Sequence, residues 1–266
     1  MRSLLRRRPV LGMTLATLSA TAVGIAIALW IDWFPVQASS ASPEIDTLYD
    51  ILMIASVPVF VLVMAVVVYS VLIFRAQPGD MSDGAPIHGN TKLEIVWVTI
   101  PFILVSALAG YGWVVLNDIE AKAADTLVVD VTGRQFAWKF EYPGAGKSKV
   151  ESDQLVLPKG RPAEFRIHTE DVIHDFWVPA FRLKSDAVPG LTTRLRTTPT
   201  KLGKYDVVCA ELCGIGHSTM RQQVSVVPDG QFEQWLLKKK KSGGDKSDAG
   251  GDTASLTPGV GYGDAR

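Results

Sequence analysis

Three apolar blocks dominate the first half of the chain, and their length predicts helices. They cover about residues 9–31, 48–74 and 95–116. The second and third blocks can cross the roughly 30 Å hydrocarbon core of a bilayer, because an α-helix rises about 1.5 Å per residue. A polar loop containing Pro and Gly lies between them. We therefore predict a transmembrane hairpin over residues 46–118, in preference to two helices buried in a protein core.

The first apolar block has two interpretations. Basic residues 6–8 precede it and the sequence Val-Gln-Ala at 36–38 follows it, a pattern typical of a secretory signal peptide. The block is also nearly long enough to be a retained membrane helix. Residues 1–38 are therefore either a signal peptide or an N-terminal transmembrane helix. In both cases the chain starts in the cytoplasm and the segment that follows is sent outward.

The basic residues beside the hairpin indicate its orientation. Arg75 and Lys92 flank the two apolar blocks on the loop side, in weak agreement with the positive-inside rule. We predict a multi-pass protein of a bacterial-type cell membrane, with the chain after residue 121 on the outer face, either periplasmic or extracellular.

The pattern changes after residue 121 to short runs in which apolar and polar residues alternate. Gly, Pro or Asp separates the runs, as is typical of strands and turns. We predict an antiparallel sandwich or small barrel over residues 121–230 and a short helix over 231–241. Residues 242–266 are rich in Gly, Ser, Asp and Thr, which predicts a disordered tail.

Charge excludes one class of partner. The 27 basic and 27 acidic side chains give a formal net charge of zero, and no stretch combines aromatic residues with a basic patch. Nucleic acid is therefore not an expected ligand.

The candidate chemistry is concentrated in one stretch, "CAELCGIGHSTM" at residues 209–220. It holds both cysteines of the chain, a histidine and a methionine, spaced Cys-x3-Cys-x3-His-x2-Met. Strand-like runs on both sides indicate a hairpin that gathers these donors on one loop. His174, in an aromatic run, could join them from a neighbouring strand. His88 lies in the membrane-side loop, and His168 lies in a different strand setting.

Three interpretations of this donor set compete. Cys209 and Cys213 could form a disulfide in an oxidising compartment, but this leaves the histidine and the methionine without a role. Zinc binds Cys and His readily but rarely Met. Thiolate, imidazole and thioether together are typical of copper electron-transfer sites, and a second Cys favours two coppers bridged by both thiolates.

With the anchor, the sandwich and these donors in view, the chain resembles subunit II of haem-copper cytochrome c oxidase. The resemblance covers roughly residues 46–227. It rests on "HGNTKLEIVWVTIPF", "GRQFAWKFEYP", "DVIHDFWVPAFRLKSDAVPG" and "CAELCGIGHSTM". It implies a transmembrane α-helical anchor followed by an all-β cupredoxin-like sandwich that carries the binuclear copper centre CuA.

The resemblance also implies the metal ligands. They are His174, Cys209, Glu211 through its backbone carbonyl, Cys213, His217 and Met220. The two thiolates would bridge both coppers. His174 and Met220 would complete one copper, and His217 and the Glu211 carbonyl would complete the other.

Four further roles follow from the same motifs. The Glu211 side chain would bind a Mg²⁺ or Mn²⁺ ion shared with subunit I, since such hard ions prefer oxygen. Glu94 would lie at the cytoplasmic mouth of a proton pathway. Phe136 occupies the position where the family usually has the Trp that accepts electrons, a departure that puts the family's usual route in doubt. Trp138 is either part of that route or a core aromatic, and we favour the core.

The implied function is electron transfer within an aerobic terminal oxidase. This subunit would accept electrons from cytochrome c on the outer face and pass them to the haem of subunit I, where O2 is reduced to water. Its apolar blocks contain no histidine, so it cannot hold that haem itself. Subunits I and III, cytochrome c and the lipid bilayer are the implied partners. The alternatives are a subunit resembling subunit II of a quinol oxidase, or a membrane-anchored copper-binding protein.

Overall fold

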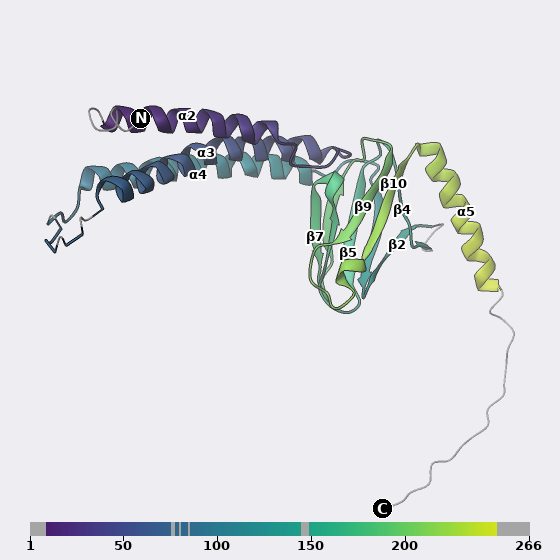
Figure 1. Cartoon of the computed structure of the whole chain (residues 1–266). Coiled ribbons are helices and arrows are strands. Elements are labelled where there is room, and N and C mark those ends of the chain that lie inside the picture. The colour runs from purple at the N-terminus through teal and green to yellow at the C-terminus, as the bar shows by residue number, and fades with distance from the viewer. Residues whose placement is uncertain (1–8, 76–77, 80, 85, 145–148, 249–266) are drawn as a thin grey trace, which may run out of the picture. The chain divides into compact units, whose positions relative to one another are not determined.

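The computed structural model describes residues 9–75, 78–79, 81–84, 86–144 and 149–248 (Figure 1). The chain divides into two compact units. The first comprises residues 1–123 with 179–183, and the second comprises residues 124–178 with 184–266.

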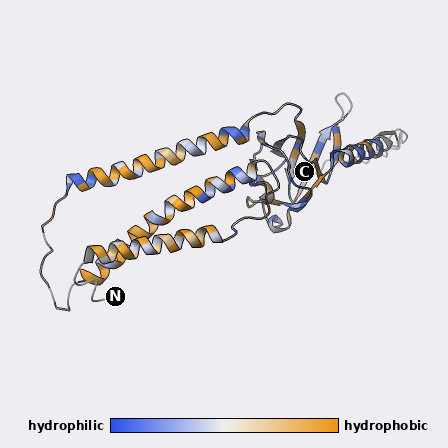
Figure 2. Ribbon diagram, turned by 90° about the horizontal axis from the view of Figure 1, so that it is seen from above, coloured by the Kyte–Doolittle hydropathy of each residue, from blue (hydrophilic) through white to orange (hydrophobic). Residues whose placement is uncertain are grey.

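Long apolar helices form most of the first unit. They are α2 (Pro9–Trp30), α3 (Ala41–Ile73) and α4 (Thr91–Glu120). Among the described residues, these three helices are long and apolar enough to cross a membrane. Figure 2 shows them coloured as hydrophobic over most of their length. The predicted hairpin corresponds to α3 and α4. Both helices begin before their apolar blocks, and α4 also ends after its block, because neighbouring polar residues are helical as well.

The first apolar block is the helix α2, and it packs closely against α3. A Cβ atom added to Gly24 would lie 2.9 Å from Cγ1 of Val57, so any larger residue at this position would force Val57 to shift. The segment that follows α2 is also fixed, because the indole Nε1 of Trp33 donates to the Ala28 carbonyl at 2.8 Å.

An ion pair with a buried arginine side chain ties the start of α3 to the short 3-10 helix η1 (Pro179–Phe181) and the residue that follows it. Arg182 donates from Nε to Oδ1 of Asp46 at 2.7 Å and from Nη2 to Oδ2 at 2.9 Å. It also donates to the carbonyls of Pro35 at 2.6 Å and Pro179 at 3.0 Å, and its guanidinium lies 4.8 Å from the centre of the Phe34 ring. We call Phe34, Pro35, Asp46, Pro179 and Arg182 the Arg182 cluster.

The second unit is a β-sandwich. In the part of the chain that the structure describes, ten strands form two sheets of five, in the orders β3-β2-β1-β5-β8 and β4-β10-β9-β6-β7. The strands are β1 (Leu127–Arg134), β2 (Ala137–Pro143), β3 (Lys149–Ser152), β4 (Leu155–Pro158), β5 (Ala163–Thr169), β6 (His174–Val178), β7 (Leu183–Ala187), β8 (Thr193–Thr197), β9 (Gly203–Cys209) and β10 (Arg221–Val227).

The predicted architecture of a helical anchor followed by an all-β cupredoxin-like sandwich is confirmed. The expectation of purely antiparallel sheets is wrong, because β1 pairs parallel to β5 and β10 pairs parallel to β4. Alternation of apolar and polar residues reports which side chains are buried, and it does not determine the direction in which an individual pair of strands runs.

Aromatic side chains fill the core between the sheets. Trp138, Phe140, Phe165 and Phe176 are all at most 2% exposed. Phe176 is central, with its ring centroid 5.4 Å from that of Trp138 and 5.6 Å from that of Phe165. This packing fixes β6, the strand that begins at His174.

A final helix, α5 (Asp229–Asp248), follows the sandwich and is longer than the expected 231–241. It packs through Phe232 and Trp235, whose ring centroids lie 6.1 and 5.0 Å from that of Tyr142. Residues 249–266 of the expected disordered tail lie outside the described residues.

Candidate metal centre

Adjacent strands of one sheet position the first two donors. His174 begins β6 and Cys209 ends β9, and the two strands pair antiparallel with Phe176 opposite Cys209. The backbone N–H of Ala210 donates to the carbonyl of Asp175 at 3.0 Å, which continues the pairing past the strand end. The loop that follows returns to β10 immediately after Met220, and the N–H of Cys209 donates to the Met220 carbonyl at 3.1 Å.

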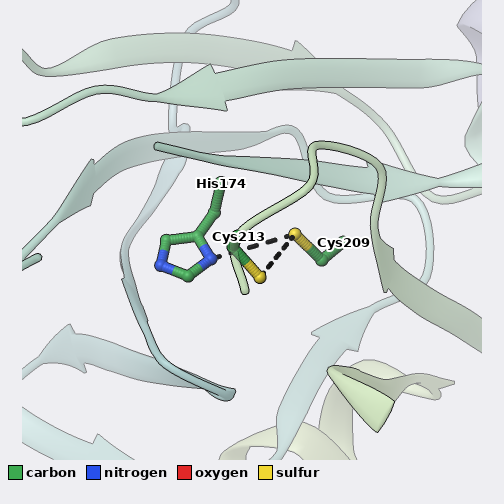
Figure 3. Close-up of side chains that lie close together, drawn as sticks. All are labelled: His174, Cys209 and Cys213. Atoms are coloured by element: carbon green, nitrogen blue, oxygen red, sulfur yellow. Dashed lines mark hydrogen bonds between the residues drawn. The ribbon is translucent and has the colours of Figure 1, made fainter. Parts of the chain in front are cut away.

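Two thiols and one imidazole converge at this point (Figure 3). Sγ of Cys209 lies 3.9 Å from Sγ of Cys213 and 3.9 Å from Nδ1 of His174. The ligand atoms of these three residues all lie within 4.8 Å of one another. One or two metal ions could bridge atoms at such separations.

The remaining predicted donors surround the same sulfur atoms. Sγ of Cys213 lies 3.6 Å from Nδ1 of His217 and 3.9 Å from Sδ of Met220. Sγ of Cys209 lies 3.2 Å from the backbone carbonyl of Glu211. The structure therefore brings together all six donors expected from the sequence, which we call the donor cluster: His174, Cys209, the Glu211 carbonyl, Cys213, His217 and Met220.

The thiols of the cluster are free and buried, at 8% exposure for Cys209 and 4% for Cys213. Burial, and after it the neighbouring Cys209, raises the pKa of the Cys213 thiol to about 11. At neutral pH this thiol therefore keeps its proton until a metal ion displaces it. The donor set suits copper, because buried soft sulfur and imidazole together favour copper over hard cations.

Asp171 determines which nitrogen of His174 faces the thiols. Its Oδ1 lies 2.8 Å from Nε2 of His174, and a carboxylate can only accept, so Nε2 carries the proton and Nδ1 presents its lone pair. Burial raises the pKa of Asp171, but hydrogen bonds from the backbone of Gln135, from His174, from the backbone of Val172 and from Thr169 outweigh it and lower the pKa to about 2. Sequence reasoning missed this residue, although its place three positions before His174 was a usable signal.

The Glu211 side chain is exposed, and its charge acts on the buried carboxyl of Asp175. Burial raises the pKa of Asp175, Lys184 lowers it, and the charges of Asp186 and Glu211 raise it further. Oδ1 of Asp175 has no hydrogen-bond partner among the described residues. A role for Asp175 was also not predicted from the sequence, because an acidic residue next to a histidine in a strand is usually exposed to solvent.

The other expected site residues have simpler surroundings. Glu94 is exposed, and its Oε1 accepts from the N–H of Asn90 at 3.2 Å while Asn90 accepts from Leu93, which caps the start of α4. Trp138 is 2% exposed, with its ring centroid 5.8 Å from that of His174, so it belongs to the core beside the donor cluster. Phe136 is half-buried and lies against the glycines of the loop.

Comparison with known families gives two matches. Residues 144–227 match the family described as cytochrome c oxidase subunit II, periplasmic domain. Residues 26–115 match cytochrome c oxidase subunit II, transmembrane domain.

Individual relatives agree with these families. The chain is 34% identical to cytochrome c oxidase subunit 2 of Thermostichus vulcanus, over 82% of this chain and 83% of the relative. It is 30% identical to the protein of the same name from Synechocystis sp., over 80% of each. Among solved structures, the periplasmic domain of subunit II of the cytochrome oxidase of Bradyrhizobium japonicum is 31% identical, with a TM-score of 0.42, over 46% of this chain and 97% of that one.

Proposed function

The chain belongs to the cytochrome c oxidase subunit II family, and from this premise we propose that it is the electron-accepting, copper-bearing subunit of an aerobic terminal oxidase. In this proposal it receives electrons from a cytochrome c and passes them to the haem of subunit I, which reduces O2 to water.

The convergence of the donor cluster carries the proposal. Two thiols, two imidazoles, a thioether and one backbone carbonyl come from two strands and one loop, with contacts of 3.2 to 3.9 Å. Zinc is rarely bound by methionine, so a zinc site would leave the buried Met220 without a role. A disulfide would leave both imidazoles without a role. A bound copper pair would supply a one-electron carrier at this position.

The chain's own residues prepare that carrier. Cys209 and Cys213 would hold both ions, because each thiol faces the other as well as one imidazole. The surrounding strands and the aromatic core exclude water from the inner side of this cluster, since His174 and Met220 are fully buried. A rigid, dry set of ligands changes little when an electron arrives or leaves, which favours fast transfer.

Partner subunits are required by the same proposal. The sequences of α2, α3 and α4 contain no histidine that could bind a haem iron. Subunit I would therefore supply the haem and the site of O2 reduction, and subunit III would complete the assembly. We propose that the three helices lie in the cell membrane and that the sandwich lies on its outer face.

The exposed Glu211 side chain is proposed as a ligand for Mg²⁺ or Mn²⁺ shared with subunit I. The buried Asp175 beside it offers a second carboxylate oxygen without a partner among the described residues, which suits a hard cation.

Three further residues keep the roles expected from their motifs. Phe136 would receive electrons from the donor protein, because its ring covers the loop that carries Cys213 and His217. Trp138 would support His174 from the core. Glu94 would start a proton pathway, a role compatible with its exposed carboxylate at the start of α4.

Purification of the full chain from membranes tests the function. We expect copper in the preparation, a multi-line electron paramagnetic resonance spectrum that one isolated copper cannot give, and co-purification of a haem-bearing subunit. His217→Asn should remove that spectrum, whereas His168→Asn should not, because His168 is hydrogen-bonded to Thr132 and is not one of the clustered donors. Copper without a haem partner would instead favour a membrane-anchored copper-binding protein. Haem without copper would favour a quinol oxidase subunit.

A further inference from the structure

The turn between β1 and β2 contacts both segments that carry the donor cluster. The side-chain amide of Gln135 donates from Nε2 to the backbone carbonyl of Cys213 at 2.6 Å. The backbone N–H of the same residue donates to Oδ2 of Asp171 at 2.7 Å. One residue, in a turn between two strands of the other sheet, therefore bonds to the loop and to the segment before β6.

Asp171 completes the connection to the imidazole. While Oδ2 accepts from Gln135, Oδ1 accepts from Nε2 of His174 at 2.8 Å. Hydrogen bonds to a carboxylate are shorter and stronger than those between neutral groups. A continuous series of three hydrogen bonds thus runs from the Cys213 carbonyl, through Gln135 and Asp171, to His174.

A second contact holds the same stretch of loop from the same turn. A Cβ atom added to Gly214 would lie 3.2 Å from the ring of Phe136, and one added to Gly216 would overlap that ring. The loop therefore lies flat on the Phe136 ring, and side chains at these two positions would lift it away. Gly214 also has a φ of 136°, a conformation that favours glycine.

We propose that Gln135 is a positioning residue that sets the distance between Cys213 and His174. This inference rests on the proposed copper function. Gln135 touches no predicted ligand atom; it holds the peptide of one ligand and, through Asp171, the ring orientation of another. The metal-free chain then already has its thiols and the His174 imidazole gathered within 4.8 Å of one another.

The expected effects follow from the loss of one donor. Gln135→Glu keeps the side-chain shape but turns the donor into a carboxylate that repels the Cys213 carbonyl. Gln135→Met keeps the volume and removes the polar group. Outer partners of metal ligands commonly affect metal affinity by 10- to 100-fold, so we expect copper affinity to fall by at least about tenfold in both variants.

A matched control comes from the same sandwich. The amide of Gln222 also donates to backbone carbonyls, those of Trp138 at 3.0 Å and Asp153 at 3.1 Å, and to none in the loop. Gln222→Glu should leave copper affinity within about twofold of the original chain. Thermal unfolding of all variants reports whether each is folded, and Gln135 is exposed enough that its loss should hardly affect the midpoint.

The deciding measurement uses the full chain in detergent without metal. Cys213 is 4% exposed, so a small alkylating reagent should modify it slowly. Release of the loop should raise that rate at least about fivefold in Gln135→Glu and Gln135→Met and leave it unchanged in Gln222→Glu. Unchanged alkylation and copper affinity in both Gln135 variants would overturn the inference. Failure of the original chain to bind a copper pair would instead overturn the proposed function, while the alkylation result would still decide the role of Gln135.

Discussion

Two polar clusters in this protein differ in how completely their own atoms are hydrogen-bonded. In the Arg182 cluster, the guanidinium donates to both oxygens of Asp46 and to two backbone carbonyls at 2.6 to 3.0 Å. In the donor cluster, the contacts between sulfur and imidazole atoms are 3.6 to 3.9 Å long. Thiols and thioethers are weak hydrogen-bonding groups, so these contacts contribute little.

The difference separates a structural cluster from a functional one. Buried polar groups normally find strong partners, and Arg182 has done so within its own unit. The donor cluster gathers groups that hydrogen-bond poorly but bind soft metal ions well, and folding alone gives little reason to bury them together. We therefore expect substitutions in the donor cluster to affect copper, and substitutions in the Arg182 cluster to affect stability.

The largest expected effect is that of Cys213→Ser. A hydroxyl is a hard, weakly acidic ligand that cannot bridge two coppers as a thiolate does, so we expect complete loss of the binuclear spectrum. Copper content per chain and electron paramagnetic resonance of the purified complex measure this. Ser218→Ala in the same loop is the control, since the Ser218 side chain is exposed and is not a predicted ligand. Survival of the multi-line spectrum in Cys213→Ser would contradict the assignment.

The Arg182 cluster leads to the second prediction, that residues 33–38 remain in the mature protein. Cleavage after Ala38 would remove the Phe34 ring and the Pro35 carbonyl from Arg182. It would also remove the bond from the Ala38 N–H to the Ala180 carbonyl, at 3.0 Å. We therefore favour a retained helix α2 over a signal peptide.

Peptide mapping of protein purified from membranes checks this prediction. Peptides that contain residues 34–38 should be recovered in the same amount as peptides from the sandwich. A mature chain that begins at or after Ser39 would contradict it.

The sequence predicted the main elements and the grouping of the donor side chains, because both depend on local patterns. Apolar block length predicted α3 and α4, and the spacing of Cys209, Cys213, His217 and Met220 predicted a single loop site. The family that it predicted from these motifs is confirmed.

Contacts between distant residues could not be predicted in this way. The bond between Gln135 and Cys213 joins residues 78 apart, and the ion pair of Asp46 and Arg182 joins residues 136 apart. From the sequence alone, Gln135, Asp46 and Arg182 are each expected to be ordinary solvent-exposed side chains. Only the folded chain brings these partners within 3 Å. The residues that support the donor cluster could therefore not be predicted from the sequence.

The third prediction concerns Arg182→Leu. The side chain of Arg182 is 4% exposed, and its loss leaves Asp46, at 19% exposure, without its main partner. Removing one member of a buried ion pair typically costs about 3 kcal/mol or more of unfolding free energy. Chemical denaturation of the detergent-solubilised chain measures this.

A solvated pair provides the control. Arg161→Leu removes an arginine whose acidic partners Asp125 and Glu233 are 86% and 50% exposed, so we expect at most about 1 kcal/mol. Equal losses in the two variants would mean that the Arg182 cluster is not the stabilising element that its bonds suggest. Copper binding should be retained by the folded fraction of both.

The smallest expected effect concerns Glu164 in the sandwich. It tests whether the ion pairs of this residue contribute to stability, as those of the Arg182 cluster are expected to. Glu164 accepts from Nε of Arg196 at 2.8 Å and from Nε of Arg166 at 3.3 Å. Burial raises the pKa of Glu164, but the two arginines outweigh it, so the pKa in the folded chain lies below its ordinary value of 4.5. A carboxyl with a lowered folded pKa contributes stability that is present above its unfolded pKa and is lost as pH falls through the folded value. We therefore expect the unfolding free energy to decline below about pH 4.5, and Glu164→Gln to make that decline shallower, as measured by denaturation at a series of pH values.

Glu151→Gln should leave the slope almost unchanged, because Glu151 is 64% exposed and solvent screens its pairing with Lys139. If the two variants had the same acid profile, the buried arginine contacts of Glu164 would contribute no more than a surface ion pair does.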